Sequence, residues 1–345
     1  MQPLDRAIYS SPAVANGRVF VGTYSYDQHA GSIMAFDAAT GEQQWVHETG
    51  RIHASAPSVG DGTLYINSGG LDNPDLVHAV DMASGAVQWT HEFAGGERIR
   101  SSPTVADGVV YASAEIGTDV QGETDVAVHA LDADTGELLW SATINHAALE
   151  YSSPAVVDGT VYHHVVDECD GDTGLYAFDA TTGETEWAVQ AGSMTGSPTV
   201  VDGTLYHSTA GLHGGGVARD AATGEILWET ARGRDATFGP AVADGTVYGT
   251  TADSGSAFAL DVASGDLQWE FDSGEARGSP VVDADTVYVP SWGEERIYAL
   301  DAADGTERWH VDLESRPYQP PAVVDGTLFV GDAARRGGLY AIAGQ

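Results

Sequence analysis

The sequence repeats one pattern eight times, and this repetition constrains the fold more than any other feature of the chain. Each unit begins with a variant of Ser-Pro-x-Val-x-Asp-Gly-x-x-Tyr, and seven of the eight continue with Ala-x-Asp-x-x-x-Gly-x-x-x-Trp. The prolines that begin the units are Pro12, Pro57, Pro103, Pro154, Pro198, Pro240, Pro280 and Pro321. The tryptophans that end them are Trp45, Trp89, Trp140, Trp187, Trp228, Trp269 and Trp309, and only Trp292 lies outside the pattern. A period of about 40 to 50 residues fits the four-stranded blade of a β-propeller and exceeds that of a leucine-rich or ankyrin repeat.

The fourth unit shows how the residues of one repeat specify strands and turns. Asp158-Gly159 is a two-residue hairpin signal between two extended runs, and Gly183 permits the positive φ that a second turn needs. The strands that we expect in this unit are Ser153–Val157, Thr160–Val166, Leu175–Phe178 and a fourth that carries Trp187, which should pack on the neighbouring blade. We therefore predict an all-β, eight-bladed propeller of four-stranded antiparallel blades, formed by residues 1–345 as a single domain.

The eighth unit stops after a third strand at Leu339–Ile342, so its outer strand must come from elsewhere in the chain. We expect Gln2–Tyr9 to complete this blade and close the ring, because closure removes exposed sheet edges. Met1 falls where the missing tryptophan of this unit should lie. This position indicates a chain that is trimmed at its start or whose start codon is misassigned.

Charge is the second constraint on the chain. It has 51 acidic and 14 basic residues, a net charge of -37, and every basic residue is arginine. Such a charge repels itself strongly in dilute buffer and is screened at about 1 M salt, where the Debye length is roughly 3 Å. The composition resembles that of proteins from salt-accumulating halophiles, so we expect folding to depend on salt. It argues against DNA or RNA as a partner, since no basic stripe is present to neutralise phosphates.

The remaining composition says little about location. Cys169 is the single cysteine, which excludes an intrachain disulfide and leaves the redox compartment unreadable. No run approaches the roughly 18 apolar residues of a membrane span, and Met1–Ser11 lacks the basic and apolar segments of a signal peptide. We expect a monomer without a membrane span.

The loops can be sorted by face, because the hairpin turns of a propeller blade alternate between its two sides. The Asp-Gly and Thr-Gly turns share one face, which is short, uniform and acidic. The connections between blades and the loops between second and third strands share the other, variable-loop face, where function usually lies. Arginine and aromatic residues gather in these loops, and we predict a binding site there. Its candidate residues are Tyr9, Arg98, Arg100, Tyr151, Arg232, Arg234, Arg277, Trp292, Arg316 and Tyr318.

Such a surface suits an anionic, planar or peptide ligand, because a guanidinium group binds a carboxylate through two hydrogen bonds and stacks on aromatic rings. The alternative is that these arginines form ion pairs with neighbouring acidic residues, namely Glu97, Asp235, Glu275 and Glu314. Both interpretations stay open at the level of the sequence.

Three other features could bind a ligand but have simpler explanations. The acidic segment Asp167–Asp172 lacks the layout of an EF-hand, which favours a solvated loop over a calcium site. His163 and His207 occupy equivalent positions in adjacent units, but without an evident third ligand we expect packed histidines rather than a metal site. Gly214–Gly216 is predicted to be a loop tip or tight turn. No catalytic motif occurs, so we predict no catalytic residue and no metal ligand.

The repeat Leu175–Trp187 (LYAFDATTGETEW) resembles the tryptophan-docking motif of the PQQ-like eight-bladed propeller family, and the resemblance covers essentially the whole chain. That family includes quinoprotein dehydrogenases, which bind pyrroloquinoline quinone (PQQ) and calcium, and the non-catalytic BamB-type assembly lipoprotein. This chain lacks the adjacent cysteine pair with which some of these enzymes hold the quinone, and its units lack their long insertions. The resemblance therefore implies a BamB-like protein of the cell envelope or the exterior.

Taken together, these features predict a non-enzymatic binding or assembly scaffold that captures a protein segment or an anionic ligand on its arginine and aromatic loops, without a cofactor. The alternative is a PQQ-dependent oxidoreductase with a degenerate quinone and calcium site near Trp292. A third possibility is a sensor or ligand-binding module of a longer protein.

Overall fold

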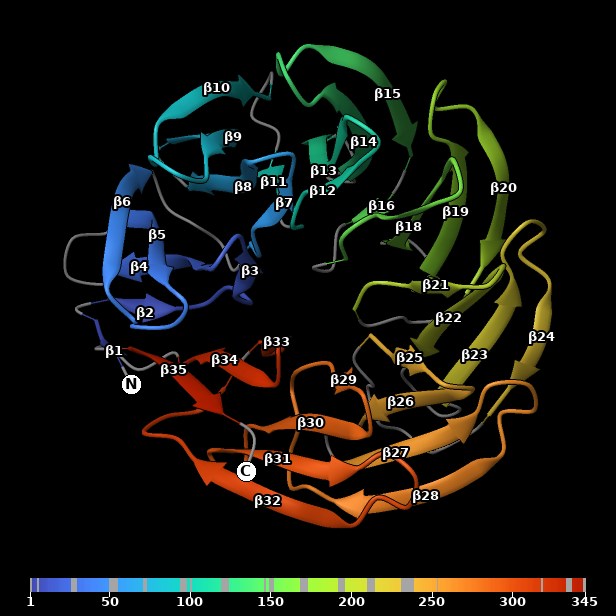
Figure 1. Ribbon diagram of the computed structural model, residues 1–345. Helices are drawn as coiled ribbons and strands as arrows, with labels where there is room; N and C mark the ends of the chain where they lie inside the picture. The colour runs from blue at the N-terminus through green and yellow to red at the C-terminus, as the bar shows by residue number, and fades with distance from the viewer. Residues whose placement is uncertain are drawn as a thin grey trace.

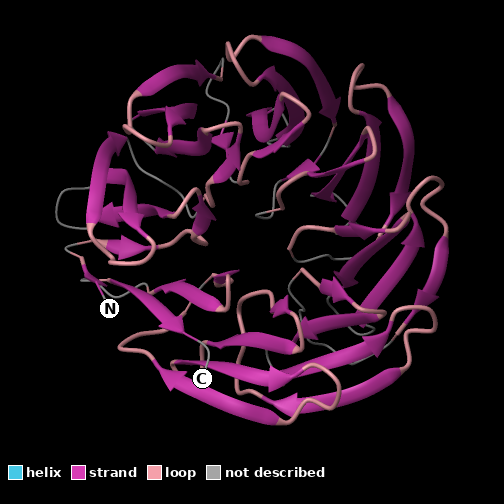
Figure 2. Cartoon of the chain, in the orientation of Figure 1, coloured by secondary structure: helices cyan, strands magenta, loops and turns pink. Residues whose placement is uncertain are grey.

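The chain forms eight antiparallel sheets arranged in a ring around a central axis (Figures 1 and 2). The computed structural model describes residues 2–4, 6–25, 30–49, 55–70, 73–93, 98–99, 101–118, 124–145, 147–148, 152–167, 173–191, 196–209, 215–230, 239–252, 254–317, 319–332 and 337–343. These residues contain strands and turns but no helix, and hence no helix that could cross a membrane. The predicted all-β, eight-bladed architecture is confirmed.

Blades 1 to 7 each hold four strands in chain order, with the first strand nearest the central axis, and blade 8 holds three such strands and takes its outer strand from the N-terminus (Figure 1). The inner strands of blades 1 to 8 are β3 (Ala13–Ala15), β7 (Ser58–Gly60), β12 (Thr104–Ala106), β17 (Ala155–Val157), β21 (Thr199–Val201), β25 (Ala241–Ala243), β29 (Val281–Asp283) and β33 (Ala322–Val324). The second strands are β4 (Arg18–Ser25), β8 (Thr63–Gly70), β13 (Val109–Thr118), β18 (Thr160–Asp167), β22 (Thr204–Thr209), β26 (Thr246–Thr250), β30 (Thr286–Ser291) and β34 (Thr327–Gly331). The third strands are β5 (Ala30–Asp37), β9 (Asn73–Asp81), β14 (Thr124–Asp132), β19 (Thr173–Asp179), β23 (Gly215–Asp220), β27 (Ser256–Asp261), β31 (Arg296–Asp301) and β35 (Gly338–Ala343). The outer strands of blades 1 to 7 are β6 (Gln43–Thr49), β10 (Val87–Glu92), β15 (Leu138–Ile144), β20 (Thr185–Gln190), β24 (Ile226–Glu229), β28 (Leu267–Asp272) and β32 (Glu307–Asp312).

The N-terminus closes the ring, but over a shorter stretch than the sequence predicts. Strand β1 (Gln2–Pro3) pairs with β35 as the outer strand of blade 8, so two ends of the chain meet in one sheet. Strand β2 (Ala7–Ile8) instead pairs with β4 of blade 1. The prediction that all of Gln2–Tyr9 belongs to blade 8 is therefore wrong beyond Pro3, because the chain crosses to the next blade after a few residues.

Two other connections between blades also contain a short strand that pairs with the second strand of the following blade. Strands β11 (Arg98–Ile99) and β16 (Ala147–Ala148) follow the outer strands of blades 2 and 3. Strand β11 pairs with β13, the second strand of blade 3, and β16 pairs with β18, the second strand of blade 4. The connecting segments thus lie along the second strands on the variable-loop face. This arrangement brings connection residues beside the loops between second and third strands.

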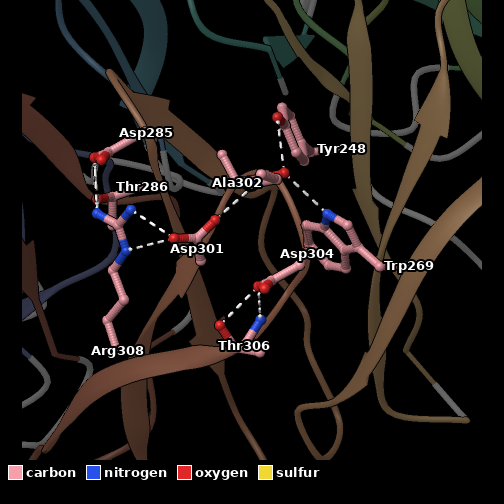
Figure 3. Close-up of polar contacts among 10 residues, drawn as sticks. Tyr248, Trp269, Asp285, Thr286, Asp301, Ala302, Asp304, Thr306 and Arg308 are labelled. Atoms are coloured by element: carbon pink, nitrogen blue, oxygen red, sulfur yellow. Dashed lines mark hydrogen bonds and ion pairs between the residues drawn. The ribbon is translucent and has the colours of Figure 1, made fainter.

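The turns of the opposite face follow the repeat closely. In the Asp-Gly turns both residues have positive φ, for example 49° at Asp158 and 79° at Gly159, a conformation that favours glycine at the second position. Blade 7 departs from this pattern, since Ala284 has φ 50° and Asp285 stands where the other blades have glycine. Arg308 holds this turn: its Nη1 lies 2.7 Å from Asp285 Oδ1 and its Nη2 lies 2.8 Å from Asp301 Oδ2 (Figure 3).

The tryptophan at the end of each unit contacts the next blade. Trp269 Nε1 and the Tyr248 hydroxyl of blade 6 both donate to the Ala302 carbonyl of blade 7, at 2.9 and 3.4 Å (Figure 3). The indole lies so close to Gly305 that a Cβ there would be 2.6 Å from two ring carbons. The indole hydrogen bond recurs from Trp45 to Met82, Trp89 to Ala133, Trp140 to Ala180, Trp187 to Ala221 and Trp228 to Val262. The repeated tryptophan and glycine therefore join one blade to the next.

The serine before the repeated proline joins the blades nearer the axis. Ser153 Oγ of blade 4 accepts a hydrogen bond from the backbone N–H of Ser102 in blade 3 at 3.0 Å. Ser153 N in turn donates to Ser197 Oγ of blade 5 at 2.8 Å. The apolar core also lies between blades rather than within them, as where Phe20 of blade 1 packs with Leu64 of blade 2.

Candidate functional site

The turn between β30 and β31, residues 292–295 of blade 7, is anchored on both sides. Gly293 N donates to the Glu275 carbonyl of the connection from blade 6, at 2.9 Å. Leu313 N, in the connection to blade 8, donates to the Glu295 carbonyl at 2.8 Å. The buried Ser291 hydroxyl accepts from Glu294 N at 3.2 Å. Three segments of the variable-loop face are thus fixed against one another around Trp292.

Two arginines from the flanking connections lie over the Trp292 ring. The guanidinium carbon of Arg277 is 4.4 Å from the ring centroid, and that of Arg316 is 3.8 Å away. Both side chains are 46% exposed, so the indole is covered by charge that water and ligands still reach. A cation over an indole face is attracted by about 0.5–1 kcal/mol at an exposed site. Three of the ten predicted site residues are therefore brought together here.

Acidic residues pair with these arginines, but only Glu275 is one of the partners that the alternative interpretation of the sequence names. Two others, Glu97 and Asp235, lie outside the described residues. Arg277 Nε lies 2.7 Å from Glu275 Oε1, and Arg316 Nε lies 3.5 Å from Glu295 Oε1. Glu314, which the sequence offers as a partner, instead donates its backbone N–H to the Tyr340 hydroxyl at 3.1 Å. Exposed pairs of this kind contribute about 0–1 kcal/mol and exchange readily with other carboxylates.

Arg296 extends the surface, and sequence reasoning missed it. Its Nη2 lies 3.0 Å from Asp312 Oδ1, and its guanidinium carbon lies 5.6 Å from the Tyr298 ring centroid. Burial raises the pKa of Tyr298, and the hydrogen bond from Arg296 opposes that rise. Arg296 escaped notice because it begins a strand rather than lying in a connection, although its spacing of two residues from Tyr298 places both side chains on one face.

Of the other predicted residues, the structure describes Arg98 and Tyr9, and neither joins this group. Arg98 is exposed on β11, where it is paired in register with Glu115 of blade 3, across the ring from blade 7 (Figure 1). Tyr9 is partly buried between β2 and β3. The candidates that lie outside the described residues are Arg100, Tyr151, Arg232, Arg234 and Tyr318. Among the described residues, Arg277 and Arg316 thus contact Trp292, and Arg296 and Tyr298 follow the same turn on β31. We call these five residues the Trp292 cluster.

The two histidines with equivalent positions are fully buried and face different blades. His163 lies between Val161 and Val165, which pack on blade 3, whereas His207 follows Leu205, which packs on blade 4. Burial lowers the pKa of each imidazole to about 3. Among the described residues no group of three or more His, Cys, Asp or Glu side chains could hold a metal ion.

The other two weak signals give mixed results. The acidic loop after Asp167, residues 168–172, lies outside the described residues. Gly215 and Gly216 are not part of a loop tip, as the sequence suggested, but begin strand β23. Glycine is required at Gly215 because a Cβ there would collide with the Thr230 carbonyl oxygen.

Solved structures of differently named proteins share the fold of this ring. BamB from Moraxella catarrhalis aligns with a TM-score of 0.73 and 17% identity over 97% of this chain and 94% of that one. A computationally designed protein, Ika8, gives 0.74 and 15% over 99% and 100%, and a europium-containing methanol dehydrogenase gives 0.70 and 14% over 94% and 82%. At these identities the likeness shows the fold alone.

Sequence relatives are more specific but cover part of the chain. BamB of Yersinia pestis is 30% identical over 201 residues, 54% of this chain and 45% of that protein. BamB of Moranella endobia is 28% identical over 195 residues, 52% and 42% of the two chains. The serine/threonine-protein kinase AfsK of Streptomyces coelicolor is 32% identical over 190 residues, 54% of this chain and 19% of the kinase. The chain thus spans less than half the length of each of these relatives.

A family model described as outer membrane protein assembly factor BamB matches the chain repeatedly, over residues 1–120, 29–162, 76–248, 171–291 and 213–345. These overlapping matches cover all eight repeats. The chain therefore belongs to the BamB-like family of PQQ-repeat propellers.

Proposed function

We propose that this propeller is a non-enzymatic scaffold that captures a protein segment or an anionic ligand on the Trp292 cluster. The observation that carries the proposal is the placement of Arg277 and Arg316 over one indole ring that is anchored to both neighbouring connections. A carboxylate that replaces Glu275 or Glu295 would gain hydrogen bonds from a guanidinium group whose position is already set. Family membership supports a scaffold role, because relatives carry the name of an assembly factor.

The proposal is tested by Arg277→Gln combined with Arg316→Gln, which keeps a polar, uncharged side chain at each position and removes both charges over Trp292. The immobilised protein is offered extract of its own source cells in high salt, and the captured proteins are quantified. We expect the double variant to capture at least tenfold less protein than the unmodified propeller does. Arg308→Gln is the matched control, because Arg308 also pairs with two carboxylates but holds a turn on the opposite face. Capture that both variants retain in full, with unchanged melting curves, would contradict the proposal.

A PQQ-dependent oxidoreductase is the second candidate, and the likeness to methanol and alcohol dehydrogenases in fold is what favours it. The described residues fit such a site poorly. A planar quinone stacked on Trp292 would have to displace Arg277 or Arg316, and the chain has no adjacent cysteine pair. A thermal melt with and without PQQ plus calcium decides between the two, since a ligand at a hundred times its Kd stabilises by about 2.7 kcal/mol.

We also propose a location in the cell envelope, which rests on the names of the relatives and on no feature of this chain. Cell fractionation with an antibody against the propeller tests it. The match to part of AfsK also keeps open a role as a ligand-binding module within a longer protein.

A further inference from the structure

One blade carries a buried charge at a position that is apolar in the others. Arg219 lies opposite Leu205 in the β22–β23 ladder and is 5% exposed. The residues at the same register position elsewhere are Phe36, Val80, Leu131, Phe178, Leu260, Leu300 and Ile342. A buried arginine is costly unless its charge is compensated, so this departure from the repeat requires an explanation.

The described partners of Arg219 are all neutral. Nε donates to His207 Nε2 at 3.0 Å, Nη1 donates to the Gly224 carbonyl at 2.8 Å, and Nη2 donates to the Gln190 carbonyl at 3.3 Å. Gln190 belongs to β20, so Arg219 bridges blades 4 and 5. These contacts use three of the five N–H donors of the guanidinium group. Burial lowers the pKa of Arg219 and the charge of Glu229, on the exposed outer strand, raises it, which leaves the group a cation at neutral pH.

Two histidines face the same seam. Tyr162 packs with Leu205 between blades 4 and 5, and His164, two residues along the same strand, points to the same side. His164 is fully buried, and neither of its ring nitrogens has a hydrogen-bond partner among the described residues. His207 accepts from Arg219 at Nε2, which places its own proton on Nδ1. Burial lowers the pKa of His164 to about 4, so each neutral ring presents one N–H donor.

We propose that the seam between blades 4 and 5 binds a small monovalent anion of the halide class, with Arg219 as its positive charge and His164 as a hydrogen-bond donor. A metal cation is disfavoured because it would lie beside a guanidinium group and His207 Nε2 is already occupied. A carboxylate-bearing chain is disfavoured because the side chains concerned are 5% exposed or less. A halide supplies the missing negative charge in the smallest volume and is abundant in the salt that the composition of the chain predicts.

The test is thermal unfolding at constant potassium concentration and constant ionic strength, while gluconate is replaced by chloride. Above the Kd, each tenfold rise in chloride should raise the folding equilibrium constant tenfold, which is about 1.4 kcal/mol. Arg219→Leu introduces the residue that blades 6 and 7 carry at this position. It should abolish the increase in stability with chloride, which we call the chloride increment. Arg308→Leu removes an exposed arginine and should retain it, since general salt effects act on both variants alike.

A chloride increment that survives in Arg219→Leu would overturn the proposal, as would a native protein that responds equally to chloride and gluconate. If Arg219→Leu does not fold, His164→Ser, which places the residue of Ser113 and Ser208 in this blade, should weaken the increment. Crystals soaked in bromide give an independent answer. We expect anomalous density beside Arg219, and a seam without such density at saturating bromide would refute the site.

Discussion

Replacing Gly305 by alanine tests whether the tryptophan contacts between blades determine the stability of the ring. Gly305 has φ +72°, and its Cβ would lie 2.6 Å from two carbons of the Trp269 indole. Gly326 has nearly the same φ, +71°, but its Cβ would meet nothing within 4 Å. Gly305→Ala and Gly326→Ala therefore impose the same backbone strain, and only the first forces the indole to move.

The magnitudes follow from these two effects. An alanine at positive φ costs about 1–2 kcal/mol, offset by about 0.4–1 kcal/mol from the less flexible unfolded chain. Gly326→Ala should therefore destabilise the protein by about 0–1.6 kcal/mol. Gly305→Ala adds overpacking of about 1–3 kcal/mol and strains the hydrogen bond from Trp269 to Ala302, which is worth about 1 kcal/mol. The free energies of unfolding of the two variants should differ by about 1–4 kcal/mol.

Urea unfolding in high salt, followed by circular dichroism and tryptophan fluorescence, measures this difference. We expect the midpoint of Gly305→Ala to fall clearly below that of Gly326→Ala, with both curves sharing one slope. Equal midpoints would mean that the Trp269 indole can move aside without lowering the free energy of unfolding. The inference that tryptophan and glycine join the blades would then be refuted.

Two further predictions concern pH and salt. Burial lowers the pKa of His78, His129 and His164 to about 4 and of His163 and His207 to about 3, so below about pH 6.5 the unfolded chain binds protons that the folded chain does not. The free energy of unfolding should therefore fall as pH decreases from 7 towards 4. His163→Val introduces the residue that blades 1 and 7 carry at this position, Val21 and Val289, and should reduce the slope by up to about 1.4 kcal/mol per pH unit. An unchanged slope would contradict this. The net charge of -37 predicts that native circular dichroism is lost as salt is dialysed away, and a spectrum that stays native-like in dilute buffer would exclude salt dependence.

The fold could be predicted because its determinants are local and repeated. The segment Thr160–Val166 was expected to be a strand, and β18 spans Thr160–Asp167. The hairpin at Asp158-Gly159 has the positive φ values that its residues indicate. Gln2–Tyr9 was assigned to a single blade because two-residue strands such as β1 and β2 carry no periodic signal, and only their partners distinguish them.

The grouping of three candidate residues could be predicted for a similar reason, whereas their role in binding stays a prediction. Arg277, Trp292 and Arg316 lie in connections or loops, and sorting the loops by face was enough to bring them together. Arg296 was missed because it belongs to a strand, where the pattern assigns residues to the sheet. The contact between Arg219 and His207 could not be foreseen, since it depends on which side of each strand faces which blade.

Repetition nevertheless makes such departures informative. Because the eight seams are built from equivalent positions, the apolar residues of seven blades show what packing alone requires at the position of Arg219. A buried ionic group replaced by a well-packed apolar residue often stabilises a protein by about 1–4 kcal/mol. Other blades carry leucine or valine at this position without loss of the fold, yet this chain keeps an arginine and two histidines in the seam between blades 4 and 5. A stability cost that the repeat itself could remove is explained if the seam binds an anion that the other seams do not.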